Sequence, residues 1–182
     1  MNQKIGILSD THGVLDADVF ATLRGCEKIV HAGDIGCGEV LAQLGWYEGR
    51  VIAITGNNDF PGSWRGEFAD ILTGLSDCVK LNLPGGILVV EHGHSIWDTR
   101  HYHERLRLKH PSAKLIVYGH THIRRVDRGL NPWVVNPGAA GRERTKQGPS
   151  CLILEISTTG QNEHHWDIQE YCFEKKPYKL SA

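Results

Sequence analysis

The sequence lacks the features that mark several common classes of protein. Its five cysteines are odd in number, widely spread and without a Cys-x-x-Cys pair, which argues against a disulfide framework and against a zinc site built from thiolates. No apolar run approaches the roughly 20 residues that span a bilayer, and we expect no signal peptide before the first predicted strand. Together these absences predict a cytoplasmic protein.

An excess of charge of either sign is also missing. The net charge is -1 and the pI is near 6.8, so we expect neither extended nucleic acid nor a membrane as a partner. The 182 residues, 40% of them hydrophobic, fit a single domain that spans residues 1–182. The residue that stands out by its abundance is histidine, which occurs 11 times.

The N-terminal third alternates apolar runs with amphipathic segments. Apolar runs at 5–8, 28–32 and 50–55 predict buried strands, and apolar residues at helical spacing predict helices over 17–23 and 38–47. This alternation is typical of a parallel sheet with helical crossovers. Residues 60–77 are expected to form a loop with a short helix or capping segment.

The remainder of the chain predicts a different arrangement. We expect a hairpin with strands at 79–83 and 87–91, a charged helix over 99–110 and a buried strand at 114–118. Further strands are expected at 124–128, 133–136, 151–156 and 163–169, joined by Gly, Pro and Asn turns. The sequence thus predicts an α/β front part followed by a part rich in antiparallel strands.

Five predicted strands end in side chains that bind metal ions. The candidate ligands are Asp10, His12, Asp34, Asn57, His92, His120 and His122. Imidazole and carboxylate without thiolate suit borderline divalent ions such as Mn, Fe or Zn, and are unlike a structural zinc or calcium site. Seven ligands are too many for one ion but suffice for two that share a carboxylate. Such pairs of ions catalyse displacement at phosphorus, so the pattern predicts phosphoester hydrolysis.

In their order along the chain these motifs resemble those of a known family. They read Asp10-Thr11-His12, Gly33-Asp34, Gly56-Asn57-Asn58-Asp59, His92-Gly93-His94 and Gly119-His120-Thr121-His122. The set resembles the calcineurin-like metallophosphoesterases, above all their small bacterial and archaeal phosphodiesterase branch, and Asn136-Pro137-Gly138-Ala139 resembles a further turn of that branch. The implied fold class is α/β, a sandwich of two β-sheets flanked by helices.

The resemblance also implies roles for the ligands. It places one ion on Asp10, His12 and His122 and the other on Asn57, His92 and His120, with Asp34 bridging the two. A hydroxide held between the ions would then attack phosphorus without a separate general base. The implied cofactors are two divalent metal ions, for which we favour Mn and keep Fe, Zn or Ni as alternatives.

Three residues of these motifs are predicted to take part in catalysis without binding metal: Asn58, Asp59 and His94. Many members of the wider family have histidine where this chain has Asn58, and an amide can donate a hydrogen bond but cannot transfer a proton. We therefore expect a preference for substrates with good leaving groups, such as aryl phosphodiesters or nucleotide derivatives. Asp59 is expected to orient its loop as an alternative to direct contact. His94 is expected to face the phosphate or to support a ligand.

Other residues leave alternatives open. His31 is expected in the core or behind a ligand, with a role as a metal ligand as the alternative, whereas His101, His103 and His110 are expected on a solvated helix face. Four arginines are candidates for binding the substrate phosphate, with plain surface positions as the alternative: Arg124, Arg125, Arg142 and Arg144. Core packing is expected for four tryptophans, with an oligomer surface as the alternative: Trp46, Trp64, Trp97 and Trp133.

The sequence favours an enzyme, but two other functions remain open. The retromer scaffold subunit of eukaryotes resembles the same branch, so the fold alone does not guarantee turnover. Because a scaffold does not need all seven ligands, their presence favours an enzyme, for which diesters are preferred to monoesters as substrates. A nucleotide or dinucleotide polyphosphate hydrolase is the second alternative. The expected partner is a small phosphoester substrate, and a homo-oligomer is left open.

Overall fold

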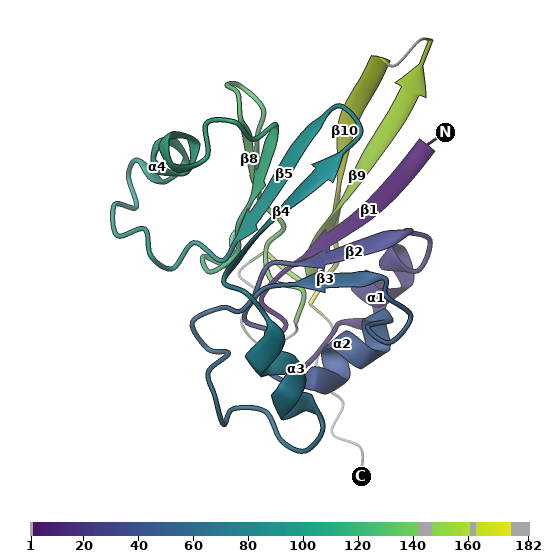
Figure 1. Cartoon of the computed structure of the whole chain (residues 1–182), viewed down its shortest axis with the longest axis vertical. Coiled ribbons are helices and arrows are strands. Elements are labelled where there is room, and N and C mark those ends of the chain that lie inside the picture. The colour runs from purple at the N-terminus through teal and green to yellow at the C-terminus, as the bar shows by residue number, and fades with distance from the viewer. Residues whose placement is uncertain (1, 142–146, 161–162, 176–182) are drawn as a thin grey trace.

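A computed structural model describes residues 2–141, 147–160 and 163–175. Within these ranges the chain forms two five-stranded sheets and four helices. The two sheets lie against each other, with three helices below the first sheet and one helix beside the second (Figure 1). This arrangement confirms the predicted fold class. Among the described residues, none of the helices has the length and apolar character needed to cross a membrane.

The first sheet combines both ends of the described chain. Its strands are, in spatial order, β10 (Glu163–Cys172), β9 (Ser150–Thr159), β1 (Asn2–Leu8), β2 (Lys28–His31) and β3 (Val51–Ala53). The strands β1, β2 and β3 run parallel, as predicted, whereas β9 pairs antiparallel with β1 and β10 antiparallel with β9. The last two strands therefore extend the front sheet, contrary to the expected division into a front and a back part.

The second sheet has a parallel centre with antiparallel edges. Its order is β4 (Cys78–Leu83), β5 (Gly86–Glu91), β6 (Leu115–Val117), β8 (Trp133–Asn136) and β7 (Arg125–Asp127). The predicted hairpin is confirmed in β4 and β5, and the strands β5, β6 and β8 are parallel. Both sheets thus present the carboxyl ends of parallel strands, the positions at which ligands bind in open α/β sheets.

Alternating side chains of the central strands lie in different apolar cores, one on each face of the sheet. In β1, Ile5 and Ile7 point into the core between the two sheets, whereas Leu8 packs under the helices of the first sheet. In β5, Leu88 likewise faces the inter-sheet core and Val89 faces the opposite side. Covering both faces explains why these strands are continuous apolar runs in the sequence.

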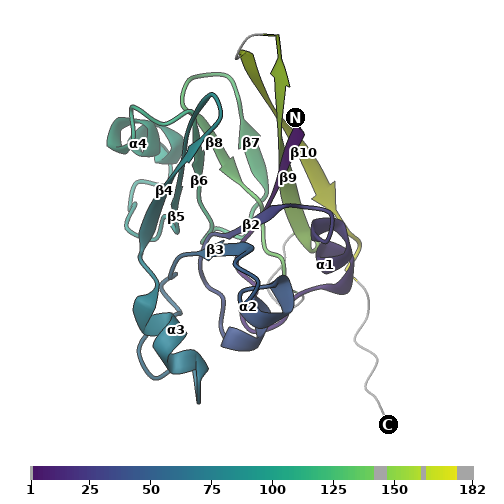
Figure 2. The same ribbon diagram turned by 45° about the vertical axis from the view of Figure 1, so that its right-hand side comes forward.

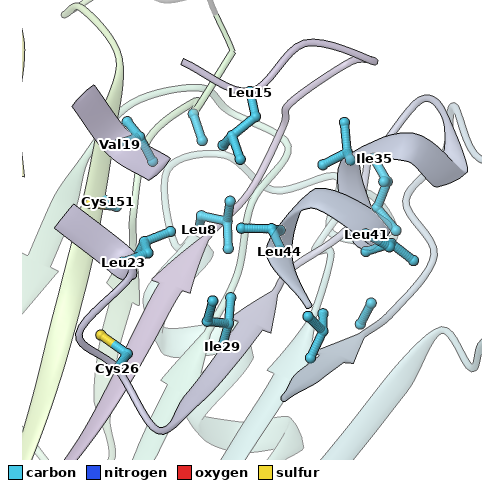
Figure 3. Packing of buried hydrophobic residues seen from close by; sticks show 14 of the residues in the cluster. Leu8, Leu15, Val19, Leu23, Cys26, Ile29, Ile35, Leu41, Leu44 and Cys151 are labelled. Atoms are coloured by element: carbon cyan, nitrogen blue, oxygen red, sulfur yellow. The ribbon is translucent and has the colours of Figure 1, made fainter. Parts of the chain in front are cut away.

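Three helices cover the outer face of the first sheet: α1 (Ala17–Leu23), α2 (Gly38–Leu44) and α3 (Phe68–Gly74). Leu23 of α1 and Leu44 of α2 pack on Leu8 and Ile29 of the strands beneath them (Figure 3). The helix α1 begins after Asp16, whose carboxylate accepts a hydrogen bond from the backbone N–H of Asp18 over 2.9 Å. The short α3 confirms the helix expected within 60–77.

The helix α4 (Tyr102–Lys109) covers the outer face of the second sheet, as the rotated view shows (Figure 2). It is shorter than the helix predicted over 99–110. Of the four tryptophans expected in the core, Trp64 is buried, and Trp46 and Trp133 pack partly buried against the cores. Trp97, between β5 and α4, is 93% exposed, so the expectation is wrong there.

Candidate metal centre

All seven candidate ligands follow strands that run parallel within their sheets. Asp10 and His12 follow β1, Asp34 follows β2, and Asn57 follows β3. From the second sheet, His92 follows β5, and both His120 and His122 follow β6. Backbone hydrogen bonds connect these loops, for example from Asp10 N–H to the Gly33 carbonyl and from Gly119 N–H to the His92 carbonyl. The centre therefore lies where the two sheets meet.

Five of the seven candidate ligands have a left-handed backbone. Their φ angles lie between 47° and 65°, and these residues are Asp10, His12, Asp34, His120 and His122. No other non-glycine residue in the described ranges has a positive φ. Such conformations are uncommon for residues with side chains and concentrate at functional sites. Here the turns occur at both ends of the Asp10-x-His12 and His120-x-His122 motifs and at Asp34.

The first group of ligands is compact. Asp10, His12, Asp34 and His122 each offer one ligand atom within 4.8 Å of all the others. His122 Nε2 lies 3.2 Å from Asp10 Oδ1 and 3.2 Å from His12 Nε2. Four nitrogen and oxygen donors converging on so small a space could hold one divalent cation.

The second group adjoins the first through Asp34. His92 Nε2 lies 3.3 Å from Asp34 Oδ2, and the His92 and His120 rings have centroids 5.4 Å apart. His120 Nδ1 and Asn57 Oδ1 are 2.9 Å apart, at hydrogen-bond distance. The structure thus brings together all seven residues that the sequence predicts as ligands.

The orientation of His92 fits a bound cation. Its Nδ1 lies 2.7 Å from the Ala32 carbonyl oxygen and must donate to it, because a carbonyl can only accept. In its neutral form the ring would offer the Nε2 lone pair to a cation beside Asp34, whose Oδ2 lies 3.3 Å from this buried nitrogen. A metal-binding histidine is typically held in this way by a hydrogen bond from its other nitrogen.

Opposing effects set the pKa values of this pair. Burial lowers the pKa of His92, but the hydrogen bond and charge of Asp34 outweigh burial, so that the pKa is raised. Burial in turn raises the pKa of Asp34, yet contacts with His92 and Asn58 lower it well below its usual range. Asp34 is therefore ionised at neutral pH and can bind a cation.

A family model for the calcineurin-like phosphoesterase superfamily domain matches residues 3–159. The chain belongs to the calcineurin-like phosphoesterase superfamily. This superfamily uses divalent metals, which agrees with the converging ligands described above. The predicted family resemblance is thereby confirmed.

Relatives within the superfamily carry phosphoesterase names. A phosphodiesterase from Methanocaldococcus jannaschii is 28% identical over 144 residues, which cover 74% of this chain and 82% of that protein. A probable metallophosphoesterase from the same organism is 28% identical over 166 residues, which cover 87% of this chain and 78% of that protein. The structure of vacuolar protein sorting 29 from Cryptosporidium parvum matches with a TM-score of 0.70 at 16% identity. The match covers 94% of this chain and 99% of that one. At that identity the likeness shows the fold alone.

Glycines let the superfamily motifs approach one another closely. A Cβ atom added to Gly56 would lie 2.2 Å from Asp34 Oδ1, and one added to Gly119 would lie 2.0 Å from Ser9 Oγ. The roles of these glycines follow from contacts that the sequence does not reveal, although both belong to the quoted motifs. Asn136, from the predicted further turn, donates from Nδ2 to the Gly119 carbonyl over 2.6 Å and so supports the His120 loop.

The three residues predicted to act in catalysis occupy different places. Asn58 binds Asp34 twice, through its backbone N–H over 2.8 Å and through Nδ2 over 2.7 Å. The Asp59 carboxylate accepts hydrogen bonds from three backbone N–H groups, at distances of 2.9 to 3.0 Å, and so joins the loops after β2 and β3. His94 is exposed, with its ring centroid 5.6 Å from that of His92. The catalytic roles of all three residues stay predictions. The contacts of Asp59 with the backbone are those expected if it orients its loop, which was the alternative to direct contact.

Several of the remaining histidines are buried. His31 is fully buried and lies 2.9 Å from Thr11 Oγ1, as expected for a core residue behind the ligands, and burial lowers its pKa to about 4. His101 is exposed, as predicted. His103 and His110 are each only 7% exposed, so the prediction of solvated side chains is wrong for both. His103 contacts Asp127 and Tyr118, and His110 contacts Glu91.

The candidate phosphate-binding arginines fall into three groups. Arg124 forms an ion pair with Glu170, with Nε and Oε2 3.1 Å apart. Arg125 is exposed, and its guanidinium has no ion pair or hydrogen bond within the ranges that the structure describes. Arg142 and Arg144 lie outside the described residues. Of the four, Arg125 alone offers an uncompensated guanidinium in the described part of the chain.

Proposed function

We propose that this protein is a dinuclear metal-dependent phosphoesterase that acts on phosphodiesters. The observation that carries the proposal is the position of Asp34 between the two groups of ligands. Its Oδ2 atom lies 3.9 Å from His12 Nε2 in the first group and 3.3 Å from His92 Nε2 in the second. A carboxylate so placed can contact two cations at once, which is the arrangement that bridging requires.

The ligand set suits two divalent ions, for which we favour Mn and retain Fe, Zn or Ni as alternatives. When bound, such ions supply an activated water and neutralise charge on the phosphoryl oxygens. The chain's own contribution is positioning: Asn58 holds both oxygens of Asp34, and the Ala32 carbonyl fixes the His92 ring. The buried surroundings of Asp10 and Asp34 strengthen their attraction for cations.

The enzyme proposal rests on the complete ligand set and on the phosphodiesterase relative. A protein-binding scaffold on the same fold is the second candidate, and the likeness to vacuolar protein sorting 29 is the observation that favours it. A nucleotide or dinucleotide polyphosphate hydrolase is a variant of the enzyme proposal and would use the same centre.

Hydrolysis of nitrophenyl esters tests the proposed function. With Mn added, we expect faster release of nitrophenolate from bis(para-nitrophenyl) phosphate than from para-nitrophenyl phosphate. Chelation should lower the rate by about a thousandfold or more, and Mn should restore it. Elemental analysis of the same sample gives the number of ions per chain. Protein that binds two ions and hydrolyses neither ester would favour the scaffold, and a preference for the monoester would contradict phosphodiester specificity.

Replacing Asn58 by histidine tests whether the amide at this position limits the choice of leaving group. We expect Asn58→His to raise kcat/KM for a dialkyl phosphodiester by about tenfold or more, because imidazole can protonate a poor leaving group and an amide cannot. The variant also loses the hydrogen bond from Nδ2 to Asp34, so Asn58→Ala serves as the matched control for that loss. Equal activity of the two variants on the dialkyl substrate would argue against leaving-group limitation at this position.

A further inference from the structure

A cavity of about 470 Å³ adjoins the candidate metal centre. Its walls come from the segment between β5 and α4, from the start of α4, and from the segment that links β6 to β7. His120, a candidate ligand, lies on the wall. A molecule bound at the metal centre could therefore extend directly into this cavity.

One part of the wall is apolar and aromatic. Ile96 and Ile123 line it, and Ile123 is 40% exposed. Tyr102 and Tyr118 also line it, with ring centroids 4.8 Å apart. The Tyr102 hydroxyl donates to the Gly93 carbonyl over 2.6 Å, and the Tyr118 hydroxyl lies 2.9 Å from His103 Nε2. Both residues are nearly buried, at 8% and 3% exposed, and because both hydroxyls already have partners, the small part of each ring that reaches the cavity is apolar.

The other part of the wall carries an uncompensated positive charge. Arg125 of β7 lines the cavity without a partner among the described residues, whereas Arg107, Arg124 and Arg128 each form an ion pair. The nearest acid on its own strand, Asp127, is bound by His103 and Arg107. The Arg125 guanidinium is therefore free to bind an anionic group of a ligand.

We propose that this cavity binds the organic substituent of the substrate, and that this substituent is a nucleoside or aryl group with a second anionic group bound by Arg125. The proposal rests on the proposed phosphodiesterase function. The volume falls within the range of about 300 to 1,000 Å³ that is usual for small-molecule sites. The combination of aromatic rings, isoleucines and one free guanidinium matches a nucleotide-type phosphodiester better than a dialkyl one.

Three diesters with the same leaving group test the proposal: the para-nitrophenyl esters of methyl phosphate, of thymidine phosphate, and of thymidine phosphate with a second phosphate on the sugar. For the wild-type protein with Mn, we expect kcat/KM to rise in that order. Arg125→Gln should lower the kcat/KM for the doubly phosphorylated ester by about tenfold relative to that for the methyl ester. Ile123→Ser should lower it about threefold or more for both thymidine esters.

A matched control and a binding measurement separate this proposal from the proposed function. Arg128→Gln removes an arginine paired with Asp167 outside the cavity and should leave all three rates unchanged. Hydrolysis of the methyl ester without a preference for the thymidine esters, or with no effect of Arg125→Gln, would overturn the cavity proposal alone. Failure to hydrolyse any ester would count against the proposed function. In that case calorimetry still tests the cavity, because thymidine bisphosphate should bind about tenfold more weakly to Arg125→Gln than to the wild-type protein. Equal binding to the two proteins would overturn the cavity proposal.

Discussion

Replacing Asp34 by asparagine is expected to lower metal-dependent phosphodiesterase activity by about a thousandfold or more. Asp34 is the residue within reach of both ligand groups, and an amide cannot supply two negatively charged oxygens to two cations. Metal ions contribute several kcal/mol to such reactions, and each 1.36 kcal/mol corresponds to a factor of ten in rate. The measurement is kcat/KM for bis(para-nitrophenyl) phosphate with Mn, together with the metal content of the variant.

Asparagine is the appropriate replacement at this position. The φ angle of Asp34 is 54°, a conformation that Asn tolerates better than Ala, so the backbone should keep its path. Asp70→Asn changes an exposed acid of α3 in the same way and should retain full activity. An Asp34→Asn variant that is folded, loaded with two ions and within tenfold of wild-type activity would contradict the bridging role.

Replacing Asp59 by alanine is expected to destabilise the fold by about 3 kcal/mol. The carboxylate accepts hydrogen bonds from the backbone N–H groups of Ile35, Gly36 and Gly56, and all three would lose their acceptor at a buried site. For a chain of this length that loss corresponds to a drop in Tm of about 6 to 12 °C. Thermal unfolding followed by circular dichroism measures the effect.

The same experiment distinguishes the loop-orienting contacts of Asp59 from direct participation in catalysis. Asp70→Ala serves as the control for removal of a carboxylate from the surface and should change Tm by less than about 2 °C. A variant with unchanged Tm but little activity would favour direct participation. A variant with reduced Tm and a proportionate loss of folded, active protein would favour the loop-orienting role.

Local sequence signals were sufficient for the strands that carry the ligands. Each apolar run is buried on both faces and stops at a polar motif, so the strand ends before Asp10, Asp34 and His120 could be located from the pattern alone. The convergence of these ends follows from the parallel pairing of β1 with β2 and of β5 with β6. The strand ends were therefore accessible from the pattern, whereas the two-sheet fold class and the grouping of the ligands came from the resemblance to the superfamily.

Features that depend on distant partners were not accessible in this way. Nothing in the composition of β9 or β10 indicates that they return to the first sheet, because strand pairing depends on packing across the whole core. His103 lies on a helix with many charges and His110 directly follows that helix, yet their partners Asp127 and Glu91 are 24 and 19 residues away in the chain. Their burial follows from those contacts, which a helical pattern does not contain.

The meeting of both sheets at one centre links cation binding to the folding equilibrium. His12 and His122 are separated by 110 positions in the chain and come from different sheets, yet their Nε2 atoms lie 3.2 Å apart. An unfolded chain cannot present such a site, so bound ions stabilise only the assembled molecule, by an amount that grows with the logarithm of their free concentration. Chelated and metal-loaded samples are thus expected to have different unfolding free energies, with the ions acting as a reversible crosslink between the two sheets.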